Sequence, residues 1–146
     1  MKKKQDVINC LRDFFDKNKE NYNPETVFLC GSWARGFPRE DSDVDIGIVF
    51  QDNTLSDDKL FEIINNISLT LSSAINLEVN IIPIYWDFRK PMLYYNIIVL
   101  GVPVYIKDYN KYVDIRNEAI FQMEDFSIFG TDWQIQVAEK NIKEIS

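Results

Sequence analysis

Two acidic residues, Asp43 and Asp45, stand one residue apart at the start of an apolar stretch that ends at Phe50. Positions two apart on a β-strand project from the same face, with Cα atoms roughly 6.6 Å apart. Two ionised carboxylates placed in this way repel each other unless a cation lies between them. Mg²⁺ suits such a site because it takes carboxylate oxygens together with substrate phosphates. The pair therefore predicts a Mg²⁺ site, with Mn²⁺ as the alternative ion.

A glycine-serine turn, Gly31 and Ser32, follows an apolar stretch and precedes an expected short helix. Glycine lets the backbone approach a ligand closely, and backbone N–H groups at a helix start, beside the Ser32 hydroxyl, can hold phosphate oxygens. Arg35 lies on the same turn and either adds a cation to the triphosphate or makes a helix-surface ion pair. Phosphate on the turn and metal on the acids would together form a phosphoryl- or nucleotidyl-transfer site.

Each half of this pattern is a weak signal when taken alone. The stretch 40–45, with the sequence EDSDVD, also fits a solvated acidic turn. The glycine-serine turn and the acidic pair on consecutive strands favour the site over that alternative, because each motif is found in the context that the other requires.

Composition limits the chemistry that the chain can perform. Its 146 residues fit one domain, without the long apolar run of a membrane span or an export signal, so we expect a cytoplasmic protein. A net charge of -7 argues against nucleic-acid binding. The sequence contains no histidine, which excludes imidazole zinc sites, Ser-His-Asp hydrolysis and histidine acid-base catalysis. Two cysteines make no disulfide framework, and each is expected to be a small core residue.

Apolar periodicity predicts an α+β fold in which a small mixed sheet is flanked by helices, with the helices on one side of the sheet. We expect a single domain over residues 1–146, with a core at about 23–107 and a helical C-terminal extension over 108–146. Its apolar residues would cap the core or present a groove to a partner helix. The expected elements are a helix at 4–18, strands at 26–30 and 43–50, a helix at 55–74, a strand at 77–85, a helix at 91–100, an edge strand at 102–106, and helical structure from 108 with a break near 129–131.

Gly31-Ser32, ten intervening residues and Asp43-x-Asp45 resemble the signature of the minimal nucleotidyltransferases of the DNA polymerase β superfamily. The stretches GSWARG and SDVDIGIVF are similar to the two motifs of that group, with Trp33 at the aromatic position. PMLYYNIIVLGVPVY is similar to its helix-glycine-strand ending. The resemblance implies a polymerase β palm-like fold and transfer of AMP from ATP. The short chain looks most like the MntA-type antitoxins, which pair with HEPN-domain toxins and transfer AMP to a toxin tyrosine.

The superfamily pattern has a third carboxylate on the strand after the long helix. The corresponding stretch is NLEVNIIPIY, which places Asn80 at that position, a departure from the pattern. Glu78 lies two residues earlier and would share the strand face. With a slightly different register it could hold metal and accept the proton of an attacking hydroxyl, and the alternative is a surface glutamate on a strand edge. If Asn80 fills the site instead, Mg-ATP binding would survive while transfer is slow or absent.

Several other segments have more than one interpretation. Trp33 is expected to be a core or interface anchor rather than a platform for adenine. Arg39 and Glu40 are expected to be solvated charges in a loop. The aromatic and basic segment at 85–95 favours a packing surface or protein interface over nucleic-acid binding.

Three functions stay open at the level of sequence. The first is AMP transfer to a toxin tyrosine, the second is a weakened antitoxin that neutralises its partner by binding, and the third is a nucleotidyltransferase acting on a small molecule such as an antibiotic. The expected partners are a nucleoside triphosphate and a HEPN-type toxin, with neither membrane nor nucleic acid. The oligomeric state is open, a homo-oligomer included.

Overall fold

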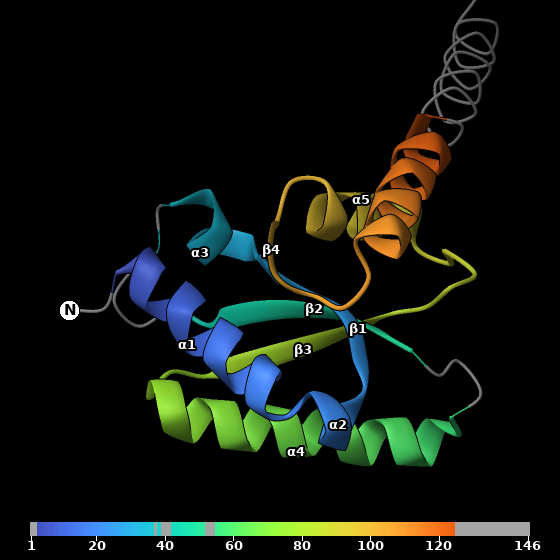
Figure 1. Ribbon diagram of the computed structural model, residues 1–146. Coiled ribbons are helices and arrows are strands. Elements are labelled where there is room, and N and C mark those ends of the chain that lie inside the picture. The colour runs from blue at the N-terminus through green and yellow to red at the C-terminus, as the bar shows by residue number, and fades with distance from the viewer. Residues whose placement is uncertain (1–2, 37, 39–41, 52–54, 125–146) are drawn as a thin grey trace, which may run out of the picture.

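A four-stranded mixed sheet forms the centre of the computed structural model (Figure 1), which describes residues 3–36, 38, 42–51 and 55–124. The order of strands across the sheet is β3-β2-β1-β4. β1 is antiparallel to both β2 and β4, whereas β2 and β3 are parallel. The predicted mixed sheet is therefore confirmed, with strands β1 (Pro24–Cys30), β2 (Val44–Phe50), β3 (Val79–Ile84) and β4 (Val102–Ile106).

The helices begin and end at residues with local reasons to do so. Ser56 caps the long helix α4 by accepting a hydrogen bond from Lys59 N, and Asn76 ends it in the left-handed conformation. Pro91 begins α5, where its missing N–H costs no helical hydrogen bond. Within the described residues, no helix is long and apolar enough to cross a membrane. The helices are α1 (Lys4–Lys17), α2 (Lys19–Tyr22), α3 (Gly31–Arg35), α4 (Asp57–Ile75), α5 (Pro91–Ile98) and one over residues 109–124.

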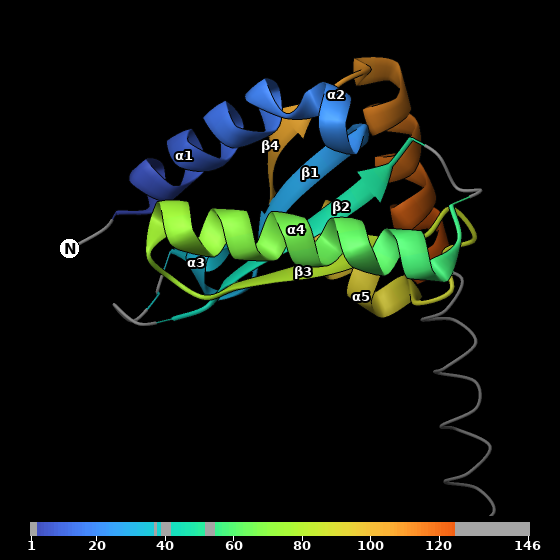
Figure 2. The same ribbon diagram turned by 90° about the horizontal axis from the view of Figure 1, so that it is seen from below.

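Helices cover both faces of the sheet, so the expectation of helices on one side is wrong. α1 and α4 lie on one face, and α5 and the helix over 109–124 lie on the other (Figures 1 and 2). The physical reason is that every residue of β1 is buried. Val27 and Leu29 join the core under α1 and α4, whereas Phe28 joins the core under α5. A strand that is apolar on both faces needs cover on both.

The helix over 109–124 belongs to the second core. Ile115 and Ala119 are buried there in the same cluster as Phe28. This part of the extension therefore caps the core, which was one of the two predictions made for it. Burial of a large aliphatic side chain contributes roughly 1.5–3 kcal/mol to stability. The predicted remainder of the helical extension and its break near 129–131 lie outside the described residues.

The sheet brings three chain segments together at one of its ends. Asp45 is the register partner of Cys30 at the end of β1 and of Asn80 near the start of β3. α3 begins directly after Cys30. The glycine turn, the acidic pair and the third position therefore meet at this end of the sheet, on the face that carries α5.

Candidate active site

Asn80 lies between the two aspartates. Its side-chain Nδ2 donates to Asp43 Oδ2 at 3.3 Å and to Asp45 Oδ1 at 3.2 Å. Both carboxylates therefore project from the same face, as their spacing predicted. The amide neutralises part of their mutual repulsion by donating to both, and hydrogen bonds to charged acceptors are stronger than those between neutral groups. Each aspartate keeps its other oxygen free of the amide.

The second oxygen of Asp45 lies against the glycine turn. Gly31 has φ +72°, and a Cβ at this position would collide with Asp45 Oδ2. Glycine is thus required twice here, for its backbone conformation and for the close approach of the carboxylate. Asp45 therefore accepts a hydrogen bond from Asn80 through Oδ1, and its Oδ2 faces the predicted phosphate turn.

Short contacts fix α3 beside the acids. The Trp33 side chain is 1% exposed, and its Nε1 donates to Ser42 O at 3.0 Å, directly before the acidic pair. Lys4 Nζ donates to Ala34 O at 2.8 Å and holds α3 to the start of α1. The prediction that Trp33 is a core anchor is confirmed. Arg39 and Glu40 lie outside the described residues.

A pocket of about 200 Å³ opens between α3, the sheet and α5. It contains predicted site residues from two elements, because Gly31 and Arg35 on α3 and Asp45 on β2 all line it. Its opposite wall comes from α5, which the sequence did not indicate as part of the site. α5 packs close because Gly47 has no side chain: a Cβ there would collide with Ile97. The remaining lining residues are Cys30, Ala34, Ile82, Leu93, Asn96, Ile97, Leu100 and Gly101.

Cys30 contributes a buried thiol to this pocket. Its Sγ donates to Asp45 O at 3.3 Å, and its side chain is buried. Burial, together with the negative charge of Asp45, raises the pKa of the Cys30 thiol to about 12. Because the thiolate is the nucleophile, Cys30 behaves as a core residue, as its composition context predicted. Cys10, half-buried, packs against the other core.

Two predicted residues are not joined to this constellation. Glu78 is exposed and precedes β3, and its backbone oxygen accepts from Val44 N at 2.8 Å. Among the described residues, no three or more Asp, Glu, His or Cys side chains group together as a metal site, so the structure does not bring Glu78 to the acidic pair. Ser32 is half-buried on the turn and is not among the lining residues. The roles of both residues remain predictions.

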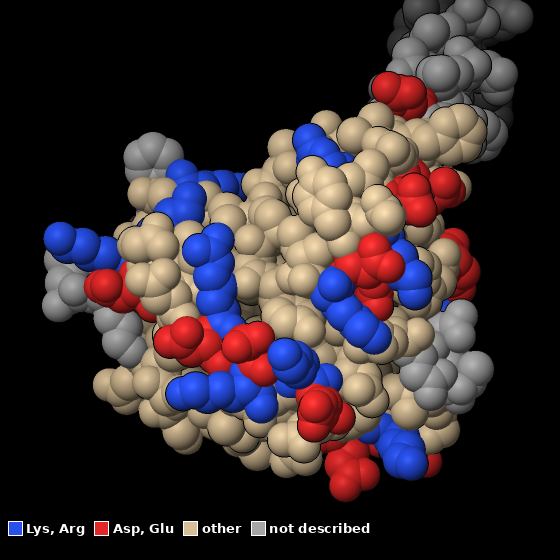
Figure 3. Space-filling view, in the orientation of Figure 1, with Lys and Arg blue, Asp and Glu red and all other residues tan. Residues whose placement is uncertain are grey.

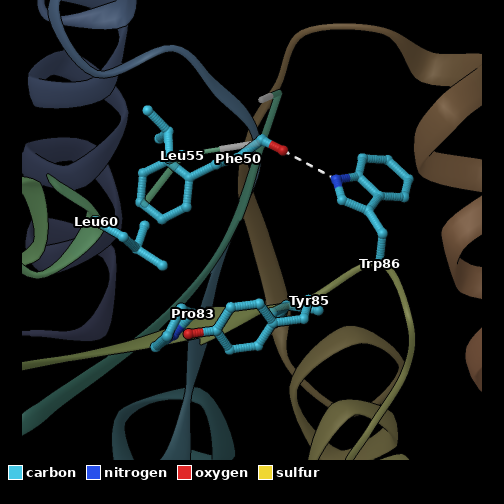
Figure 4. Close-up of a pocket in the computed structure, with 7 residues that line it drawn as sticks. Phe50, Leu55, Leu60, Pro83, Tyr85 and Trp86 are labelled. Carbon is cyan, nitrogen blue, oxygen red and sulfur yellow. Dashed lines mark hydrogen bonds between the residues drawn. The ribbon is translucent and has the colours of Figure 1, made fainter. Parts of the chain in front are cut away.

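A second, smaller pocket lies at the opposite end of β2 (Figure 4). Its volume is about 40 Å³, and its lining includes Phe50, Leu60 and Tyr85. Trp86 Nε1 donates to Phe50 O at 3.1 Å beside it. It contains none of the predicted site residues.

The predicted aromatic and basic segment at 85–95 adjoins this second pocket. Arg89 donates to Asp87 at 2.9 Å and lies 3.9 Å from the centre of the Tyr85 ring, while Phe88 and Tyr94 are buried. The bonds from Arg89 lower the pKa of the Asp87 carboxyl. Arg89 therefore makes its polar contacts within the segment, and Phe88 and Tyr94 pack into the core. On the face shown in Figure 3, acidic and basic side chains intermingle rather than forming a basic patch.

Comparison with known proteins places this site in a family. Residues 9–110 match the family described as Polymerase beta, Nucleotidyltransferase. The chain belongs to this family and is a nucleotidyltransferase. It is 33% identical over 82 residues to a protein of Methanocaldococcus jannaschii named "Putative protein adenylyltransferase MJ1215", covering 56% of this chain and 90% of that protein.

Solved structures share the fold at lower identity. A chain of the toxin-antitoxin MntA-HepT aligns with a TM-score of 0.62 and 16% identity, covering 91% of this chain and 97% of that chain. A toxin-antitoxin structure with AMP-PNP aligns with a TM-score of 0.61 and 17% identity, covering 88% of this chain and 96% of that chain. A chain from a complex of tri-AMPylated Shewanella oneidensis HEPN toxin with MNT antitoxin aligns with a TM-score of 0.62 and 16% identity. The alignment covers 92% of this chain and 98% of that chain. At these identities the likeness establishes the fold, which confirms the predicted nucleotidyltransferase architecture.

Proposed function

We propose that this nucleotidyltransferase moves AMP from ATP, with Mg²⁺, to a tyrosine hydroxyl of a partner HEPN-type toxin and thereby acts as an antitoxin. The observation that carries the proposal is the contact between Asp45 and the Gly31 turn beside a pocket large enough for part of a nucleotide. Support for adenylyl transfer comes from the name of the M. jannaschii relative. Support for the acceptor comes from structural neighbours that hold AMP-PNP or a tri-AMPylated toxin.

The residues present fit a divalent cation with oxygen ligands. Asp43 and Asp45 each have one oxygen that Asn80 does not occupy, and Asp45 Oδ2 faces the turn where phosphate would lie. These two aspartates would hold Mg²⁺, which supplies neutralisation of charge on the triphosphate. Mn²⁺ has the same preference for oxygen.

The chain's own groups define the rest of the reaction. The turn at Gly31 would hold the β- and γ-phosphates, and Arg35, exposed at the pocket, would add positive charge. The acceptor oxygen forms a bond to the α-phosphorus while the bond between that phosphorus and the bridging oxygen breaks. Pyrophosphate leaves with the electron pair, and the hydroxyl proton passes to a base.

Asn80 cannot be that base, because a neutral amide has no site that takes a proton at neutral pH. Glu78 is the candidate on this chain, if the loop before β3 moves its exposed carboxylate toward the pair. Otherwise the proton leaves to solvent or to a group of the partner, and transfer is slow. This arrangement favours a second function, in which the chain neutralises its partner by forming a complex with little or no transfer.

Label transfer from α-³²P-ATP with Mg²⁺ into a lysate of the source cell tests the proposal. The control is the double variant Asp43→Asn, Asp45→Asn, with its fold checked by circular dichroism. A labelled protein band that is lost with the control supports protein adenylylation and identifies the acceptor. Label in a small molecule instead would support a nucleotidyltransferase that acts on a small molecule such as an antibiotic. The absence of label with retained Mg-ATP binding would support an antitoxin that neutralises its partner by binding.

A further inference from the structure

The wall of the active-site pocket opposite α3 is apolar apart from one side chain. Ile82, Leu93 and Leu100 contribute aliphatic surface, and Leu100 is 61% exposed. Asn96 on α5 is the neutral polar side chain in this wall. Binding sites for small ligands usually have this composition, with an apolar lining and a few polar groups that fix orientation.

The Asn96 amide is available to a ligand. Asn96 is exposed, and among the described residues its side chain makes no hydrogen bond. It differs in this from Asn80 in the same site, whose amide is used by two carboxylates. An asparagine side chain carries one acceptor and two donors in a plane. Asn96 can therefore form a pair of hydrogen bonds with a flat ligand that presents a donor beside an acceptor.

We propose that α5 forms the base subsite of the nucleotide and that Asn96 determines the preference for adenine. This inference rests on the proposed function, since it assigns a position to part of the nucleotide in that same site. With the phosphates at Gly31 and the α-phosphate at Asp45, the pocket continues toward α5, where the nucleoside end extends. A flat base covers Leu93 and Leu100 and removes their apolar surface from water.

Hydrogen-bond chemistry explains why the base is adenine. Adenine presents an amino donor beside a ring-nitrogen acceptor, and an asparagine amide pairs with both, as it does with adenine in DNA. An ionised carboxylate only accepts hydrogen bonds, so it cannot satisfy the adenine ring nitrogen. It matches instead the two neighbouring N–H donors on the pairing edge of guanine. A change from amide to carboxylate should therefore move the preference from ATP toward GTP.

The test is the binding of ATP and GTP analogues that carry a methylene between the α- and β-phosphates, measured by calorimetry with MgCl₂. We expect Asn96→Ala to weaken the ATP analogue about tenfold, with the GTP analogue little changed. Asn96→Asp should lower the ratio of ATP to GTP affinity about a hundredfold, since it removes one match and creates another. Asn65→Asp on α4 introduces the same charge on an exposed helix position that does not line the pocket and serves as the matched control.

Two outcomes separate this inference from the function on which it rests. If the wild type binds the ATP analogue and Asn96→Asp leaves the affinity ratio equal to that of Asn65→Asp, the base subsite is overturned and the proposed function stands. If the wild type binds neither analogue, the proposed transfer of AMP is overturned together with the subsite. Thermal unfolding of each variant confirms that the comparison is made between folded proteins.

Discussion

Replacing the Asn80 amide with a carboxylate should make the free protein less stable and its metal affinity higher. In the wild type, Nδ2 donates to two carboxylate oxygens at 3.3 and 3.2 Å. Asn80→Asp exchanges both hydrogen bonds for two like-charge contacts at similar separation. Each contact costs about 1 kcal/mol in a dielectric close to that of water, which suits these exposed side chains. The lost hydrogen bonds add about 1 kcal/mol each.

The expected loss of stability without divalent cations is therefore about 2–4 kcal/mol. For a domain of this size the loss corresponds to a Tm lower by about 10 °C. Thermal unfolding in EDTA at low ionic strength measures it. Asn80→Ala removes the same hydrogen bonds without adding charge, so its Tm should lie between those of the wild type and Asn80→Asp.

A divalent metal ion should offset most of this loss of stability in Asn80→Asp. A third carboxylate about 4 Å from a divalent ion adds roughly 2 kcal/mol of attraction in water, which is a gain in affinity of about 30-fold. Titration with Mg²⁺ or Mn²⁺ by calorimetry gives this ratio directly, and saturating metal should remove most of the Tm deficit by mass action. AMP transfer should rise by 10²-fold or more if the new carboxylate also takes the acceptor proton, which is the usual scale of general-base catalysis.

Three results would contradict the reasoning. Unchanged Tm of Asn80→Asp in EDTA would mean that the amide does not bridge the aspartates in solution. Unchanged metal affinity would mean that the cation binds elsewhere. Unchanged transfer, combined with a large loss in Glu78→Gln, would assign the base to Glu78 and make position 80 unimportant for proton transfer.

Further predictions follow from single contacts. Gly31→Ala should lower the free energy of unfolding by at least 1–2 kcal/mol and abolish nucleotide binding, because the new methyl group meets both a positive φ and a carboxylate; chemical denaturation and calorimetry measure the two effects. The Cys30 thiol, with its pKa raised to about 12, should resist iodoacetamide at pH 8.5 in the folded protein while half-buried Cys10 reacts faster, as mass spectrometry of the labelled peptides would show. Unfolding returns the Cys30 pKa toward 9.0, so this group's contribution to stability is complete below pH 9 and is lost as the pH rises from 9 toward 12. Trp33→Phe keeps most of the buried ring but loses the indole donor, which should cost about 1 kcal/mol in unfolding and weaken nucleotide binding by loosening the turn.

The sequence predicted the elements of the site because local patterns specify them. The spacing of Asp43 and Asp45 on an apolar strand gave their common face, and the helical and strand periods gave most elements to within a few residues. The arrangement of helices on two faces was missed. A mostly apolar strand such as β1, which also buries Glu25 and Thr26, can have helices on one face or on both, and only the sheet order determines which strands need cover on both faces.

The α5 wall was missed for a different reason. Asn96 lies 51 residues after Asp45 in number, and nothing in its own segment marks it, because an exposed asparagine on a short helix is an ordinary residue. Its significance comes from the close approach of α5 to β2 at Gly47. A glycine within an apolar strand is the signal that could have been used, since it often marks a place where another part of the chain approaches closely.

The residue at position 80 also bears on whether partner binding and AMP transfer both require Mg²⁺. Three carboxylates at this end of the sheet would need a cation to relieve their repulsion, whereas the Asn80 amide holds Asp43 and Asp45 together by hydrogen bonds alone. Because these hydrogen bonds hold the pair together without a cation, we expect a partner that recognises the folded surface to bind without Mg²⁺. If neutralisation works by complex formation, capture of the partner from lysate should be equal in EDTA and in Mg²⁺. Capture that needs Mg-ATP and is lost in the Asp43→Asn, Asp45→Asn variant would instead tie the partner to the transfer reaction.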